Sequence, residues 1–324
     1  MIVRWKLGEL PGVLAELGVE RPLLVTSRRW GALDLPVARR FDGVRPHAPA
    51  DSVAAATAAA VDVDGVIALG GGSAIDTGKA VSAETGLPLV SVPTTYAGAE
   101  WTPGFGVRDE ERGVKVGGGG ATLAGIVYDV ELTLSLPEGE SGGTALNALA
   151  HCAEALYVRG RNDAADFEAL VGARLISGSL PRVLADGGDR EARSELLQGA
   201  MHAGAALGGA GLGLGHAMAQ AIGGRYGIAH GAANAVCLPP ALRFNEPVAG
   251  AAIARYGAAM GVDDAVGRTE ELARLAGFER LRDLGVPEPE LSLVAEAAAV
   301  RGGAKANPRS ASPPEILQLL RSVW

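Results

Sequence analysis

The sequence predicts an α/β dinucleotide-binding domain built on a parallel sheet, followed by an all-helical domain. Two observations carry this prediction. Apolar runs alternate with helical segments in the first part of the chain, and this order is typical of a doubly wound parallel sheet. Further on, β-branched runs disappear, and Ala, Leu, Gly and charged residues recur at helical spacing. We place the boundary at Pro137, which gives an α/β domain over residues 1–137 and a helical substrate domain over residues 138–324.

A glycine loop, Gly70-Gly71-Gly72, separates a buried apolar strand from a helix. Glycines let the backbone turn sharply, and their missing β-carbons let a phosphate approach the amides. The helix N-terminus adds N–H groups and partial positive charge. We expect Ser73 to cap this helix, with Asp76 as a capping-box-like partner. The loop predicts a phosphate or pyrophosphate site; the alternative is a tight turn with no ligand.

A second polar loop, Thr94-Thr95-Tyr96, follows the next apolar strand. Ligands of open parallel sheets bind beyond the carboxyl ends of the strands, where both loops fall. We therefore assign both loops to a dinucleotide site. The other elements expected in this domain are a helix at 7–17, strands at 22–26, 66–69, 87–93 and 126–129, a helix at 52–61, a hairpin at 105–115 and a flexible loop at 117–120.

The end of strand 22–26 bears on the choice of cofactor. Dinucleotide folds often place an acidic residue there to hold the ribose hydroxyls. Here Ser27 and Arg28 follow the strand, and they tolerate a 2′-phosphate or are ordinary surface residues. NADH and NADPH both remain possible cofactors.

The second half is predicted to be helical throughout. Asn147 precedes His151 by four residues and shares its helix face. The expected helices are 141–158, 163–184, 190–207, 214–222, 231–244 with a break at Pro239-Pro240, 247–260, 262–276, 280–284, 289–300 and 313–323.

Three histidines, His151, His216 and His230, are spread over the helical half. Three imidazoles can hold zinc with an open fourth position. Asn147, however, offers a neutral amide, which is a poor ligand for Zn²⁺ or Fe²⁺ and cannot offset their charge. A metal site and a set of hydrogen-bonded core histidines both remain open from the residues alone.

Composition excludes several classes of partner. The chain has 324 residues and a formal net charge of −8 with scattered basic residues, which argues against nucleic acid. We see no secretory h-region at the N-terminus and no apolar stretch of membrane-spanning length. Cys152 and Cys237 lack paired or metal-type spacing, so we expect a reducing, cytoplasmic compartment.

The motifs together amount to a resemblance. Residues 70–76 and 93–103 resemble the cofactor loops of the iron-containing (group III) alcohol dehydrogenase superfamily, which implies a dehydroquinate synthase-like fold. Further stretches are similar to its maleylacetate reductase branch: Gly113–Lys115, Tyr128–Leu134, Asn147–Tyr157 and Asn307–Arg309. The resemblance runs from about His47 to about Asn245, with an echo near the C-terminus.

The resemblance implies the function. The superfamily binds its metal through one Asp and three His, which fall here on Asn147, His151, His216 and His230. Maleylacetate reductases resemble this chain in having Asn first, and are regarded as working without metal. The implied reaction is NADH- or NADPH-dependent reduction of maleylacetate to 3-oxoadipate in aromatic degradation, in a cleft between the domains of a homodimer. Those four residues and Lys115 are the expected catalytic residues.

Such a substrate carries carboxylates, which need cations or hydrogen-bond donors; Lys115, Arg225 and Arg309 are candidates by type. Two departures leave other functions open. Gln220 and Asn234 stand where the superfamily typically has histidines. The alternatives are a metal-dependent dehydrogenase of a small alcohol or aldehyde, and a non-catalytic or repurposed member.

Overall fold

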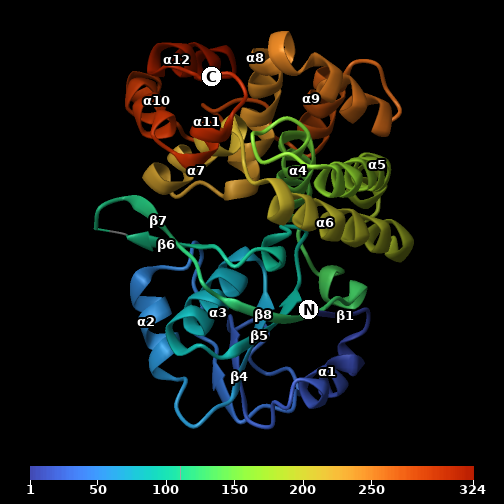
Figure 1. Cartoon of the computed structure of the whole chain (residues 1–324), viewed down its shortest axis with the longest axis vertical. Helices are drawn as coiled ribbons and strands as arrows, with labels where there is room; N and C mark the ends of the chain where they lie inside the picture. The colour runs from blue at the N-terminus through green and yellow to red at the C-terminus, as the bar shows by residue number, and fades with distance from the viewer. Residues whose placement is uncertain (110) are drawn as a thin grey trace. The chain divides into compact units, whose positions relative to one another are not determined.

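The computed structural model describes residues 1–109 and 111–324. The chain forms two compact units (Figure 1). The first contains residues 1–95 and 99–136, and the second contains residues 96–98 and 137–324. Among the described residues, no helix combines the length and the apolar character that crossing a bilayer requires.

A parallel sheet forms the centre of the first unit. Its described strands run in the order β1-β8-β5-β4-β2-β3, and every pairing between neighbours is parallel. This confirms the predicted sheet. The strands are β1 (Ile2–Arg4), β2 (Pro22–Thr26), β3 (Arg39–Phe41), β4 (Gly65–Gly70), β5 (Pro88–Pro93) and β8 (Thr122–Val127). The three-residue strands at both edges, β1 and β3, are absent from the sequence prediction because they are too short to show a period.

Helices cover both faces of this sheet (Figure 1). Ile67 and Leu69 of β4 pack with α1 (Leu10–Glu16) on one face. Val66 and Ala68 point the other way and pack with α2 (Ala50–Ala58) and α3 (Gly72–Thr85). Alternate side chains of β4 therefore bury opposite faces, which is why the strand reads as one continuous apolar run.

The remaining elements of this unit are short. The expected hairpin is confirmed as β6 (Phe105–Asp109) and β7 (Val114–Gly118), which pair antiparallel. The prediction of a flexible loop at 117–120 is wrong for its first two residues, because they belong to β7. Single 3₁₀ turns complete the unit: η1 (Leu7–Glu9), η2 (Ala99–Trp101) and η3 (Val130–Thr133).

The second unit is helical, as predicted. Its helices are α4 (Glu138–Ala155), α5 (Asp163–Ala185), α6 (Arg190–Ala210), α7 (Leu214–Tyr226), α8 (His230–Ala259), α9 (Ala265–Leu275), η4 (Glu288–Glu290), α10 (Leu291–Ala299), α11 (Gly302–Ala306) and α12 (Pro313–Ser322). Within α4, every residue from Ser141 to Ala155 except Thr144 is buried, so neighbours surround this helix. Chemically active side chains on α4 are therefore held inside the unit.

Two helix predictions are wrong. The chain does not break at Pro239-Pro240, because α8 continues through both prolines and departs from helical dihedrals only at Ala249. Proline fixes φ near the helical value, and its cost is a lost N–H bond rather than an obligatory end. The expected helix at 280–284 is instead a run of turns.

Candidate active site

The glycine loop joins the carboxyl end of β4, a central strand of the sheet, to α3. Gly70 has a φ of +146°, which favours glycine, and a β-carbon on Gly71 would lie 2.9 Å from Cγ2 of Thr95. The backbone N–H of Thr94 donates to the Gly70 carbonyl at 3.0 Å. The two loops that the sequence assigns to the cofactor are thus joined at Gly70 and Thr94.

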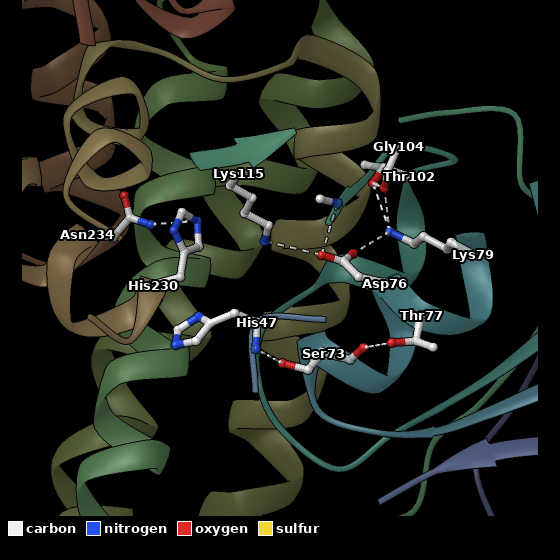
Figure 2. A network of polar contacts seen from close by, with 11 residues as sticks. His47, Ser73, Asp76, Thr77, Lys79, Thr102, Gly104, Lys115, His230 and Asn234 are labelled. Atoms are coloured by element: carbon white, nitrogen blue, oxygen red, sulfur yellow. Dashed lines mark hydrogen bonds and ion pairs between the residues drawn. The ribbon is translucent and has the colours of Figure 1, made fainter. Parts of the chain in front are cut away.

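The prediction that Ser73 caps α3 is wrong. The N-cap is Gly71, and no side chain of the described residues accepts a capping hydrogen bond there. Instead the Ser73 hydroxyl accepts the backbone N–H of His47 at 2.9 Å (Figure 2). The N-terminus of a 14-residue helix therefore keeps its positive end without a side-chain acceptor, which fits a phosphate.

Asp76 lies one turn into α3 and organises charges around it. Its Oδ2 is 3.4 Å from Nζ of Lys115 and accepts the backbone N–H of Gly106 at 3.2 Å (Figure 2). Lys79 lies 3.7 Å from Oδ1 and donates to the Gly104 carbonyl at 2.8 Å. Burial lowers the pKa of Lys79 despite its partner Asp76. The carboxylate thus ties the hairpin and its Lys115 to the helix that begins at the glycine loop.

The other predicted cofactor residues differ in their surroundings. Ser27 is partly exposed just after β2, whose Thr26 pairs with Leu69 beside the glycine loop. Tyr96 is wholly buried in the second unit, and Nη1 of Arg193 donates to its hydroxyl at 3.0 Å. The Tyr96 side chain is therefore held by contacts inside the second unit, and its place among the cofactor residues stays a prediction.

Three imidazoles gather in the second unit, as the sequence predicts for His151, His216 and His230. The rings of His151 and His216 are stacked, with centroids 4.7 Å apart and planes at 16°. The ring of His230 is tilted against His216, with centroids 5.6 Å apart. His230 reaches this place because α8 crosses α4 closely: a β-carbon on Gly231 would lie 2.2 Å from the Gly143 carbonyl oxygen.

Glu154 is a residue of the cluster that sequence reasoning missed. It is fully buried on α4, three residues after His151. Its Oε2 lies 2.7 Å from Nδ1 of His216 and accepts the N–H of Gly213 at 2.6 Å. Asn147, His151 and Glu154 are spaced four and three residues apart, which places them on one face of α4. This spacing could have identified Glu154 from the sequence. Because a carboxylate only accepts, it holds a proton on Nδ1 of His216, while Nε2 of that ring has no partner among the described residues.

Asn147 belongs to a chain of buried amides. Its Nδ2 donates to the carbonyl of Ala97 at 3.1 Å, and its Oδ1 accepts from Nδ2 of Asn234 at 2.7 Å. The same Asn234 nitrogen lies 3.1 Å from Nε2 of His230 (Figure 2). Both ends of the Asn147 amide are therefore used inside the protein.

Several buried polar atoms of the cluster have no hydrogen-bond partner among the described residues: Nδ1 of His151, Nε2 of His216 and Oδ1 of Asn234. Unpaired buried polar atoms are costly, so such a group indicates a place for a polar ligand or water. Burial, followed by the neighbouring His216 and His230, lowers the pKa of His151 well below its ordinary range. His151 is therefore neutral at physiological pH.

The donor set of the described residues offers no free anionic ligand to a divalent metal. It contains neutral imidazoles and an amide, and the nearby carboxylate of Glu154 is engaged by His216 and Gly213. Stacked, nearly parallel rings do not direct their in-plane lone pairs at one point. Across residues 1–109 and 111–324, no group of three or more His, Cys, Asp or Glu is arranged to hold an ion.

Two of the cationic candidates have other partners. Arg225 is 2.7 Å from Glu290. Arg309 is 2.9 Å from Glu315 and lies over the ring of Phe244. Lys115 of the first unit likewise pairs with Asp76, so all three cations have an acidic neighbour, and their roles toward the substrate stay predictions. Gln220 is partly buried on α7.

Comparisons with known proteins identify the family of the chain. Residues 2–124 match the family described as iron-containing alcohol dehydrogenase, and residues 142–324 match the Fe-containing alcohol dehydrogenase family, C-terminal. The chain is 34% identical over 331 residues to a maleylacetate reductase of Pseudomonas knackmussii, covering 98% of this chain and 93% of that protein. A maleylacetate reductase of a Rhizobium species is 36% identical over 311 residues, covering 90% and 87%.

Solved structures of members of this family have a similar fold. The maleylacetate reductase of Agrobacterium tumefaciens has a TM-score of 0.90 at 32% identity, covering 100% of this chain and 95% of that one. An iron-containing alcohol dehydrogenase of Corynebacterium glutamicum has a TM-score of 0.92 at 30% identity, covering 100% and 94%.

Proposed function

The chain belongs to the iron-containing alcohol dehydrogenase family and is an oxidoreductase, and we propose that it reduces maleylacetate to 3-oxoadipate with NADH or NADPH, without a metal. Asn147 is the observation that carries this proposal. An amide stands where the superfamily places its anionic ligand, and both its ends are held by Ala97 and Asn234. The named relatives support the substrate, and the neutral donor set supports the absence of metal.

The first unit is proposed to hold the cofactor, which supplies a hydride when bound. The glycine loop and the uncapped end of α3 suit its pyrophosphate. Asp76 fixes Lys115 beside this helix, where an ammonium group suits an anionic oxygen. Ser27, Thr94 and Thr95 stay predictions as further cofactor contacts.

The second unit is proposed to supply the polar groups for the substrate. Maleylacetate has a carbon–carbon double bond conjugated to a ketone, and its reduction adds one hydride and one proton. Hydrogen bonds to the ketone oxygen stabilise the negative charge that develops there. His151, His216 and His230 are the proposed donors, and Nε2 of His216 is the nitrogen through which a proton is exchanged.

The test is an NAD(P)H-oxidation assay with maleylacetate, run with and without EDTA and added Fe²⁺ or Zn²⁺. We expect turnover that chelation leaves unchanged, and 3-oxoadipate as the product. A panel of small alcohols and aldehydes tests the metal-dependent dehydrogenase as the rival function. Absence of turnover with maleylacetate, combined with metal-dependent alcohol oxidation, would establish that rival instead.

A further inference from the structure

We propose that Asn234 is a positioning residue that keeps His230 neutral with its proton on Nδ1, so that His230 acts as a hydrogen-bond donor and not as the proton carrier. The catalytic consequence rests on the proposed function. The protonation state itself is a property of the resting protein, carried by hydrogen bonds within the second unit.

The direction of these hydrogen bonds is set at Ala97. A backbone carbonyl can only accept, so the group of Asn147 that faces it at 3.1 Å is the amide nitrogen. The Asn147 oxygen then faces Asn234 at 2.7 Å. Rotating the Asn147 amide by 180° would place its oxygen against the Ala97 carbonyl oxygen. Only 4% of the Asn147 surface is exposed, so solvent would not relieve this repulsion.

The next step fixes Asn234. Because the Asn147 oxygen accepts, Asn234 must present its nitrogen, which carries two hydrogens. One hydrogen is donated to Asn147 and the other points to Nε2 of His230 at 3.1 Å (Figure 2). Asn234 is completely buried, so both hydrogens of its amide nitrogen need partners inside the protein. An N–H that faces Nε2 requires an unprotonated nitrogen there, and the proton of the neutral ring then lies on Nδ1.

His216 is held differently. Glu154 accepts its Nδ1–H, and Nε2 of His216 has no partner among the described residues. Nε2 of His216 can therefore exchange a proton with a ligand, whereas Nε2 of His230 is occupied by Asn234, which leaves Nδ1–H as the donor of that ring. The two neighbouring rings therefore take separate tasks, with His216 as the proton carrier and His230 as a donor to the substrate.

The experiment is a long-range ¹H–¹⁵N spectrum of the full-length protein labelled at histidine, with the His230 signals assigned from the His230→Gln variant. We expect an unprotonated Nε2 and a protonated Nδ1 for His230 in the wild type at neutral pH. In Asn234→Asp, a carboxylate faces Nε2, and we expect the proton to appear on that nitrogen while the His216 pattern is retained. Gln318→Glu makes the same change on an exposed face of α12 and should leave both patterns unchanged.

Asn234→Ala is the neutral companion variant in case the new buried carboxylate prevents folding. It removes the donor, so the Nε2 and Nδ1 signals of His230 should report a mixture of tautomers. In turnover, both variants should lower kcat by roughly 10–100-fold, the range for lost orienting partners, with a smaller change in KM.

A protonated Nε2 of His230 in the wild type, or an unchanged His230 pattern in folded Asn234→Asp or Asn234→Ala, would overturn the inference. The proposed function fails separately. If the wild-type spectrum is as expected and maleylacetate is not reduced, the tautomer assignment stands and the reductase proposal is wrong.

Discussion

Glu154 and His216 form a completely buried pair in which Oε2 lies 2.7 Å from Nδ1. The carboxylate also accepts the backbone N–H groups of Gly213 and His216. It therefore fixes the first turn of α7 as well as the imidazole, and it holds a proton on Nδ1 of His216.

Replacing this carboxylate tests that role. In Glu154→Gln, the new amide N–H group faces one of the groups that donate to Glu154, which are the backbone N–H of Gly213 or His216 and Nδ1–H of His216. Because the His216 ring then loses its orienting partner, we expect kcat to fall roughly 10–100-fold. The free energy of unfolding should drop by about 1–3 kcal/mol, the cost of an unpaired buried donor. Steady-state kinetics and urea unfolding measure both. Glu168→Gln is the matched control, because Glu168 pairs with His202 in a partly exposed position. An unaltered kcat in folded Glu154→Gln contradicts the role.

The glycine loop is tested by Gly71→Val. The side chain would crowd Thr95 and occupy the space beside the N-terminus of α3, so we expect loss of NADPH affinity by more than about tenfold, or ~1.4 kcal/mol. Fluorescence titration measures it. Gly8→Val, where a β-carbon meets nothing within 4 Å, should bind normally. Wild-type affinity in folded Gly71→Val would remove this loop from the cofactor site.

Cofactor preference is tested at Ser27. No acidic residue follows β2, so NADPH should bind at least as well as NADH. Ser27→Asp places a carboxylate near the expected 2′-phosphate, and we expect it to weaken NADPH by about tenfold, ~1.4 kcal/mol, while NADH binding changes little. Paired titrations decide the question. A wild-type preference for NADH above about tenfold would be the opposite of the expected result.

Metal independence is tested by elemental analysis of protein purified without chelator, alongside turnover before and after EDTA. We expect less than stoichiometric metal and undiminished activity. Each His→Ala change at 151, 216 or 230 should lower kcat or raise KM without any loss of metal. A lost donor that acts only in the transition state costs ~10²–10³ in kcat. Activity that chelation abolishes and Fe²⁺ restores would favour the alcohol dehydrogenase reaction.

His151 gives a prediction for pH. Its pKa in the folded protein is lowered well below the ordinary 6.5, so below that pH the unfolded chain binds a proton that the folded protein excludes. Stability contributed by neutral His151 is complete above about pH 7.5 and is lost as pH falls from 6.5 toward the folded pKa, by up to ~1.4 kcal/mol per pH unit. In urea unfolding, the stability gap between wild type and His151→Gln should be constant above about pH 7.5 and narrow on acidification. If the difference in unfolding free energy between wild type and His151→Gln stays constant down to about pH 5.5, the lowered pKa of His151 is excluded as a source of pH-dependent stability.

Much of the fold was predictable because its signals are local. Buried parallel strands such as β4 are unbroken apolar runs, and the glycine loop marks the turn that follows. Pro239-Pro240 misled because a local rule for helix ends was applied where surrounding helices bury the segment. The edge strands β1 and β3 form because they pair with strands elsewhere in the chain. Three residues are too few to show the sequence pattern of a strand.

The site was predicted in part, for a similar reason. Asn147 and His151 share one helix face, so their proximity could be read from spacing. The role of Glu154 depends on α7, some sixty residues later, and that of Asn234 depends on the carbonyl of Ala97 in an earlier loop. No residue type in the sequence reveals a backbone carbonyl as the group that orients two side-chain amides.

Residues 96–98 have a consequence for dividing the protein. This three-residue segment belongs to the second unit although the chain on both sides of it belongs to the first. It supplies the Ala97 carbonyl to Asn147 and the Tyr96 hydroxyl to Arg193. A gene fragment starting at Pro137 would therefore encode the helices of the second unit without residues 96–98. Co-expressing residues 1–136 would restore the contacts of Ala97 and Tyr96 only if this segment inserted among those helices. A single cut in the gene therefore cannot separate the two units without removing residues 96–98 from the second.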